Sequence, residues 1–162
     1  MKKKNIVIPV LFGGLGNQLF IYAAAKRLAI INNAELMLDT ESGFIRDFQY
    51  KRKYQLENFN IKEKKLLINK RYTFFTRIKR FLLRFFNSKK IFNDSRYIVQ
   101  EGMDFDSRLL KKRVNSYLYL SGYWQSEDYF IDIEDIIRND LIITMPNDKK
   151  NLDSAQNINN TN

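Results

Sequence analysis

Short apolar runs separated by polar turns organise the first part of the chain. Residues 6–12 are apolar throughout, which is typical of a strand buried on both faces of a sheet. Pro9 cannot donate a ladder hydrogen bond, so the strand is expected to be bulged or at a sheet edge there. Residues 18–32 have helical spacing and end at two asparagines, and residues 34–39 read as a second strand. This order predicts a βαβ unit with parallel strands.

Weaker patterns follow along the rest of the chain. Residues 40–62 mix aromatic and charged side chains and are expected to form loops and short elements. The remaining expected elements are a long helix over 64–86, short strands over 96–100 and 116–122, a short helix or turn over 105–113, a helix over 126–138, and an apolar, strand-like run over 140–145. The pattern predicts an α/β fold, followed by a polar tail over 147–162.

Composition narrows the available chemistry. The chain has 162 residues, of which 44% are hydrophobic, enough for one domain with a real core. It has no cysteine and no histidine, so disulfides and thiolate zinc sites are excluded, and the commonest general base is missing. Any catalysis by this chain must use carboxylates, Tyr, Lys, Arg or backbone groups.

The excess positive charge is concentrated in one segment. Residues 60–96 carry 12 Lys and Arg against 2 Asp and Glu, within a chain of net charge +10. On a helical wheel this segment's apolar face contains Phe74, Phe75, Ile78, Phe81, Leu82, Phe85 and Phe86, opposite Arg77, Arg80 and Arg84. Either this face packs on the domain, or a basic amphipathic helix over 64–86 lies on an anionic membrane. No nucleic-acid-binding module is recognisable, so a nucleic-acid partner is not expected.

The glycine-rich run from Gly13 to Phe20 is the main candidate site. It joins the first strand to the helix, where free backbone N–H groups and the helix dipole favour a phosphate or sugar. The candidate ligand-binding residues are Gly14, Gly16, Asn17 and Gln18. A dinucleotide fingerprint would need a third glycine at Leu19, although Asp39 stands where a ribose-binding acid would be. A purely structural turn is the other alternative.

Two further motifs admit two interpretations each. Asp104-Phe105-Asp106 has the spacing of a metal-binding D-x-D, but no buried strand precedes it, which favours a solvated turn leading into a short helix. In the run from Gly122 to Phe130, Ser126 can cap a helix. Tyr123 and Trp124 can either pack or stack on a sugar, so Trp124 and Gln125 are also candidate substrate-binding residues.

Four segments, in this order, resemble the α-1,2-fucosyltransferases of glycosyltransferase family 11. They are Gly13–Phe20 followed by Tyr22 and Ala23, Leu38–Thr40, Arg52–Ile61 and Gly122–Phe130. The resemblance covers about residues 5–146 and is weakest over 64–93. It implies that residues 1–146 form an incomplete Rossmann-like lobe, the N-terminal lobe of a GT-B-like enzyme. The implied reaction transfers L-fucose from GDP-fucose to the 2-hydroxyl of a galactose in a glycan, without a metal or other cofactor. It also implies a cytoplasmic protein acting on acceptors built at the inner face of the membrane.

One departure from the family is substantial. The arginine-rich motif His-x-Arg-Arg-Gly-Asp, which in the family holds the nucleotide-sugar phosphates, does not occur in this sequence. We therefore expect this chain to correspond to about the N-terminal half of a transferase. Departure of GDP develops negative charge that fixed cations stabilise, so we expect no measurable fucose transfer by this chain alone. The other hypotheses are a non-catalytic module that binds a membrane surface or a partner, and a nucleotide-binding oxidoreductase fragment.

Overall fold

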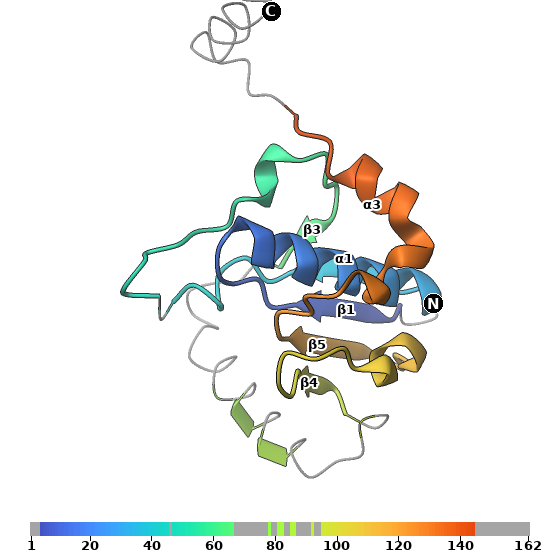
Figure 1. Cartoon of the computed structure of the whole chain (residues 1–162). Helices are drawn as coiled ribbons and strands as arrows, with labels where there is room; N and C mark the ends of the chain where they lie inside the picture. Colours follow the sequence, from blue (N-terminus) through green and yellow to red (C-terminus); the bar gives the residue numbers. More distant parts are fainter. Residues whose placement is uncertain are drawn as a thin grey trace, which may run out of the picture.

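The computed structural model describes residues 4–45, 47–66, 78, 81–82, 85–86, 92 and 95–144. Five parallel strands form one sheet in the order β3-β2-β1-β5-β4 (Figure 1). They are β1 (Ile6–Pro9), β2 (Glu35–Leu38), β3 (Lys64–Lys65), β4 (Tyr97–Val99) and β5 (Tyr117–Ser121). The predicted α/β class and the predicted parallel βαβ unit are confirmed, and the sheet is compatible with a Rossmann-like lobe.

Strand β1 lies at the centre of the sheet, so the expectation that Pro9 marks an edge or a bulge is wrong. Pro9 is the last residue of the strand and aligns with Leu120 of β5. Its missing N–H falls on the side of β2, where pairing stops after Val7 and resumes only at the bridge between Val10 and Asp39. The proline is tolerated because its carbonyl still accepts from Asp39 N, at 3.0 Å.

Helix α1 (Leu15–Ile31) covers one face of the sheet beside β1 (Figure 1). Its sequence is unusually rich in alanine along the middle turns, and Ala23, Ala24 and Ala25 are buried. Small side chains let the helix axis approach the strands closely while good helix propensity is kept. The helix ends at Asn32, as predicted, where the side-chain amide donates to Leu28 O and to Lys112 O and the side-chain oxygen accepts from Val114 N.

The segment after β5 is more broken than its periodicity indicated. The expected helix over 126–138 consists of η4 (Glu127–Tyr129), η5 (Ile131–Ile133) and α3 (Glu134–Asp140). The strand expected over 140–145 is also wrong for its described part, because Asp140 ends α3 and only Ile143 pairs, in one antiparallel bridge with Phe59. The short elements η1 (Leu56–Asn58) and η3 (Ser107–Lys111) agree with the expected loop and turn regions.

The long helix expected over 64–86 does not begin at Lys64. Lys64 and Lys65 form β3, which pairs with Met37 and Leu38 at the edge of the sheet. A neighbouring strand with free backbone groups has overridden the local helical pattern here. Five later residues, 78, 81, 82, 85 and 86, are helical. The other residues of that segment after Leu66, and the polar tail over 147–162, lie outside the described residues.

Candidate functional site

The glycine turn lies at the carboxyl end of β1, where ligands bind in open α/β sheets. Gly13 has a φ of +76°, which favours glycine, and Gly14 is the N-cap of α1. Within the described part of the chain no side chain caps this helix, and its first turn contains no acidic residue. A Cβ placed on Gly14 or on Gly16 would have no heavy atom within 4 Å. The start of α1 therefore presents its first N–H groups and its partial positive charge beside open space.

Asn17 and Gln125 connect two segments that are far apart in the sequence. The Gln125 Nε2 donates to the Asn17 Oδ1 at 2.7 Å. Asn17 is half-buried and Gln125 is exposed, so this pair lies at the surface above the ends of β1 and β5. The side chain of Asn17 folds back over Gly13, where a Cβ would fall 2.5 Å from the Asn17 Nδ2. Two predicted site residues are thus brought together.

Gln18 was predicted to bind a ligand, but its side chain faces the interior of the protein. Its side chain is fully buried, and its Nε2 donates to the carbonyl oxygens of Gly13 and Lys53, both at 3.0 Å. Its Oε1 accepts from Gln55 N at 3.0 Å. Both N–H donors of the amide and one lone pair of its oxygen are therefore used within the protein. Gln18 instead holds the loop around Lys53 against the glycine turn.

The prediction that Trp124 binds substrate is also wrong, because its indole is fully buried and cannot stack on a sugar. It packs edge-on against Tyr129, with the ring centroids 5.4 Å apart. Its φ of +53° is unusual for a bulky residue and is held by Gln100, whose Oε1 accepts from the backbone N–H groups of Tyr123 and Trp124 at 2.8 and 2.9 Å. Tyr123 packs against Phe12.

Gln100 and Gly122 form a close contact that the sequence interpretation missed. A Cβ on Gly122 would lie 2.4 Å from the Gln100 Cβ, and the φ of +153° at this glycine is one that L side chains rarely adopt. The Gln100 Nε2 and the Trp124 Nε1 are buried without a partner among the described residues. The only sequence signal was a glycine directly after a strand.

Asp39 supports a turn instead of a ribose. Its carboxylate is buried and accepts from the backbone N–H of Ser42 at 2.9 Å and from the Ser42 hydroxyl at 2.5 and 2.7 Å. This turn brings Gly43 so close that a Cβ there would lie 2.1 Å from the Leu11 carbonyl oxygen. Gly43 was not singled out in the sequence. The dinucleotide interpretation loses its acidic residue, because that carboxylate is committed to the turn.

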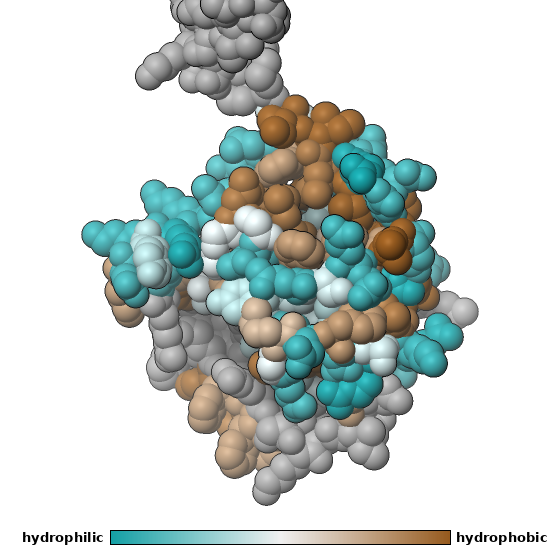
Figure 2. All heavy atoms as spheres, viewed as in Figure 1, coloured by the Kyte–Doolittle hydropathy of each residue, from teal (hydrophilic) through white to brown (hydrophobic). Residues whose placement is uncertain are grey.

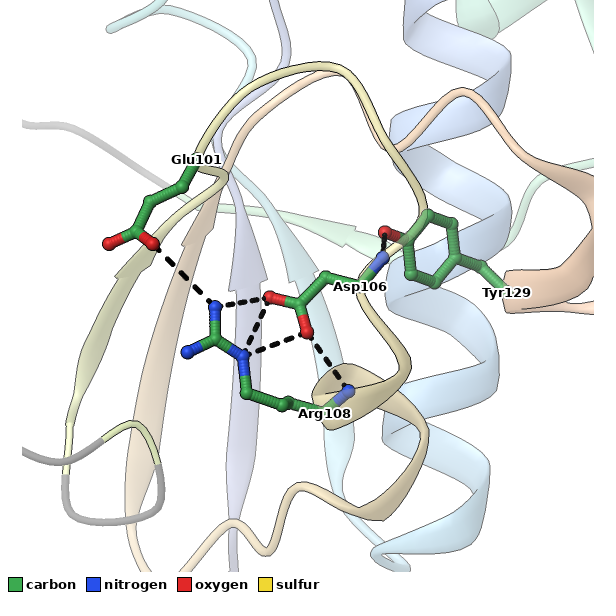
Figure 3. A network of polar contacts seen from close by, with 4 residues as sticks. All are labelled: Glu101, Asp106, Arg108 and Tyr129. Atoms are coloured by element: carbon green, nitrogen blue, oxygen red, sulfur yellow. Dashed lines mark hydrogen bonds and ion pairs between the residues drawn. The ribbon is translucent and has the colours of Figure 1, made fainter.

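The second aspartate of the D-x-D motif, Asp106, is the N-cap of η3 (Figure 3). This agrees with the predicted turn leading into a short helix. Asp106 accepts from the Arg108 backbone N–H at 3.0 Å, and its carboxylate is also bonded by the Arg108 Nε and Nη2, at 2.9 and 2.7 Å. The Arg108 guanidinium holds the pKa of the Asp106 carboxyl below its usual range. The buried Tyr129 hydroxyl accepts from Asp106 N. Across the described ranges, no three Asp or Glu side chains are grouped as metal ligands would be.

Charged side chains join α1 to the segments that pack on it. The Tyr22 hydroxyl donates to the Asp140 carboxylate at 2.7 Å, and Lys26 pairs with both Asp140 and Glu63. Burial, together with the bond to Asp140, raises the pKa of Tyr22. Burial alone would lower the pKa of Lys26, but hydrogen bonds to Glu63 and Asp140 outweigh it and raise that pKa. This cluster lies away from the glycine turn and ties the end of α3 to the helix.

Arg27 joins α1 to η5 by an ion pair. Its Nε and Nη2 donate to the Asp132 carboxylate at 2.7 and 2.8 Å. The pKa of Asp132 is lowered chiefly by this hydrogen bond. The pair fixes η5 against α1, so it has a structural role.

A pocket of about 440 Å³ lies at the amino ends of the strands, beside the start of β2, whereas the glycine turn lies at their carboxyl ends. Four lysines and two glutamates are among its lining residues. Two of these lysines, Lys26 and Lys64, are already paired with Glu63 and Glu35. Two of the four lysine charges of the pocket are therefore compensated within the protein.

No family model matches this chain, and comparisons with curated proteins and with solved structures found no significant match. The fold and the contacts above are therefore the basis for assigning a function. Among the described residues, no helix has the length and hydropathy needed to cross a bilayer.

Proposed function

We propose that this chain is the N-terminal, sugar-nucleotide-facing lobe of an α-1,2-fucosyltransferase of the GT-B-like type. The observation that carries the proposal is the convergence of three segments that resemble this family. Gln125 bonds to Asn17, and Gln18 bonds to the backbone at Lys53 and Gln55, so residues from all three segments surround the start of α1. A convergence of this kind is expected if the segments build one site.

The groups at the start of α1 are suited to bind a sugar nucleotide. The N–H groups of the first turn of α1 are directed at open space, and an anionic phosphate is the ligand that they favour most. The Asn17 and Gln125 amides lie within the same surface and offer both donors and acceptors to sugar hydroxyls. These residues bind and orient a ligand, and none of them is a general base.

The proposed reaction breaks the bond between fucose C1 and the β-phosphate oxygen of GDP and forms a bond from C1 to the galactose 2-oxygen. The 2-hydroxyl loses its proton to a base, and GDP leaves with the negative charge. The sequence contains no His-x-Arg-Arg-Gly-Asp motif to stabilise that charge. We therefore expect this chain to bind GDP-fucose weakly and to transfer no fucose.

Saturation-transfer NMR with GDP-fucose tests the proposal, because it detects weak binding. We expect signals from the nucleotide sugar with the unmodified chain and at least tenfold weaker binding with Asn17→Ala. Asn115→Ala is the matched control, since Asn115 is exposed just before the amino end of β5, whereas the glycine turn follows the carboxyl end of β1. Equal binding by the Asn17 and Asn115 variants, or no binding by the unmodified chain, would contradict the proposed site. NADH serves as the competing ligand for the oxidoreductase hypothesis.

A further inference from the structure

Five apolar residues form an exposed ridge on one helical face. They are Ile78, Phe81, Leu82, Phe85 and Phe86, and we call them the apolar ridge. Their exposed fractions lie between 41% and 68%. Figure 1 draws them in green beyond β4, apart from the sheet, and Figure 2 shows hydrophobic surface in the same region. The first sequence interpretation, in which this face packs on the domain, is wrong for these residues.

The spacing of the ridge is that of one helical stripe. Positions 78, 81, 82, 85 and 86 are separated by the intervals of three and four residues that align side chains along a helix. The rings of Phe85 and Phe86 contact each other edge-on, with centroids 5.7 Å apart. An exposed stripe with three phenylalanines is costly in water, so it indicates a surface that is covered by something apolar.

The charge of the surrounding sequence indicates what covers the ridge. Residues 60–96 contain 12 Lys and Arg and only 2 Asp and Glu. Arg77 directly precedes the ridge in the sequence, and Lys79, Arg80 and Arg84 stand between its residues. A second copy of the chain would bring the same cations and would be repelled. A surface that combines an apolar interior with anionic groups satisfies both the phenylalanines and the cations.

We propose that the apolar ridge docks this protein on the surface of an anionic bilayer. The phenylalanine rings enter the boundary between headgroups and acyl chains, and the neighbouring cations attract the acidic headgroups. This binding is peripheral, and it does not depend on the proposed fucosyltransferase activity, because no residue of the ridge belongs to the glycine turn.

Co-sedimentation with vesicles tests the proposal. The full chain is mixed with phosphatidylcholine vesicles or with vesicles containing 30% phosphatidylglycerol, at about 0.1 M salt, where the Debye length is about 10 Å. We expect at least tenfold tighter binding to the anionic vesicles and a marked loss at about 1 M salt. The double variant Phe81→Asp, Phe85→Asp is expected to bind anionic vesicles at least tenfold more weakly.

Phe48→Asp is the matched control, because Phe48 is 80% exposed but lies in a separate turn. It should bind vesicles like the unmodified chain. Circular dichroism verifies that the three proteins are equally folded, which is expected since all the replaced side chains are exposed. Equal binding by the double variant and the unmodified chain overturns the proposal, and so does a lack of preference for anionic lipid. Displacement of the vesicles by single-stranded RNA would instead assign the ridge to a nucleic acid.

Discussion

Replacing Gly16 with alanine should raise stability and weaken ligand binding at the same time. Gly16 lies in the first turn of α1, is exposed, and would have no heavy atom within 4 Å of an added Cβ. Alanine is favoured over glycine inside a helix by about 0.5–1 kcal/mol, because glycine loses more backbone entropy on folding. With no steric cost to subtract, we expect the free energy of unfolding to rise by about that amount. The corresponding rise in Tm is about 1–4 °C.

The same methyl group would stand where the proposed sugar nucleotide approaches the backbone. It would hold a phosphate away from the first N–H groups of α1, and we expect at least tenfold weaker binding of GDP-fucose, equivalent to about 1.4 kcal/mol. Urea unfolding measures the stability, and saturation-transfer NMR measures the binding. Asn139→Ala, an exposed replacement in α3, is the control that should improve helix propensity without changing binding.

Two results would refute this reasoning. A loss of stability greater than about 1 kcal/mol in Gly16→Ala would mean that the space beside the turn is filled in solution, because an unhindered helical alanine is stabilising. Unchanged GDP-fucose binding in a correctly folded variant would remove the backbone of the turn from the site. The two measurements are independent, so a folding defect cannot be mistaken for a binding defect.

Three other substitutions test contacts that stabilise the fold. Gly43→Ala should destabilise the fold by about 3 kcal/mol in urea unfolding, because its Cβ would meet a backbone oxygen at 2.1 Å; a change below about 1 kcal/mol would show that this turn can move aside. Tyr22→Phe should cost about 1 kcal/mol by removing the hydroxyl bonded to Asp140, and a neutral result in thermal unfolding would argue against that bond. The pKa of Asp106 is lowered in the folded state, so its ionised carboxylate stabilises the fold fully above the unfolded-state pKa, near 3.8, and this stabilisation is lost as the pH falls through the folded-state pKa. The free energy of unfolding should therefore fall less on acidification in Asp106→Asn than in the unmodified chain. Parallel pH profiles of the two proteins would exclude the effect.

The elements that periodicity identified best are the ones whose partners are close in the sequence. The runs that became β1, α1 and β2 adjoin one another, so each buries its apolar side chains mainly against its neighbours. The alternation of residues 116–122 likewise gave β5. Periodicity failed at Lys64, because the unpaired edge of β2 is a partner that no local pattern reveals.

Among the predicted site residues, too, local sequence placed some correctly, whereas contacts distant in the sequence decided the others. Gly14, Gly16 and Asn17 lie at the start of α1, as a glycine-rich turn between a strand and a helix requires. Gln18 follows directly in the sequence, yet its position on the helix turns it inward, toward a loop more than thirty residues away. Trp124 is buried because Gln100, from the preceding strand region, fixes the backbone that carries it. In both cases the deciding contact is nonlocal.

The sequence by itself determined the alternation of strand, glycine turn and helix, the absence of histidine and cysteine chemistry, and the concentration of positive charge in residues 60–96. These follow from composition and from periods of two and 3.6 residues, which are local properties. The tertiary structure decided which polar side chains remain available. It joined Asn17 to Gln125, buried Gln18, Asp39 and Trp124, and left the apolar ridge exposed. Hydrogen-bond partners and burial depend on chain segments distant in sequence, and only folding brings these together.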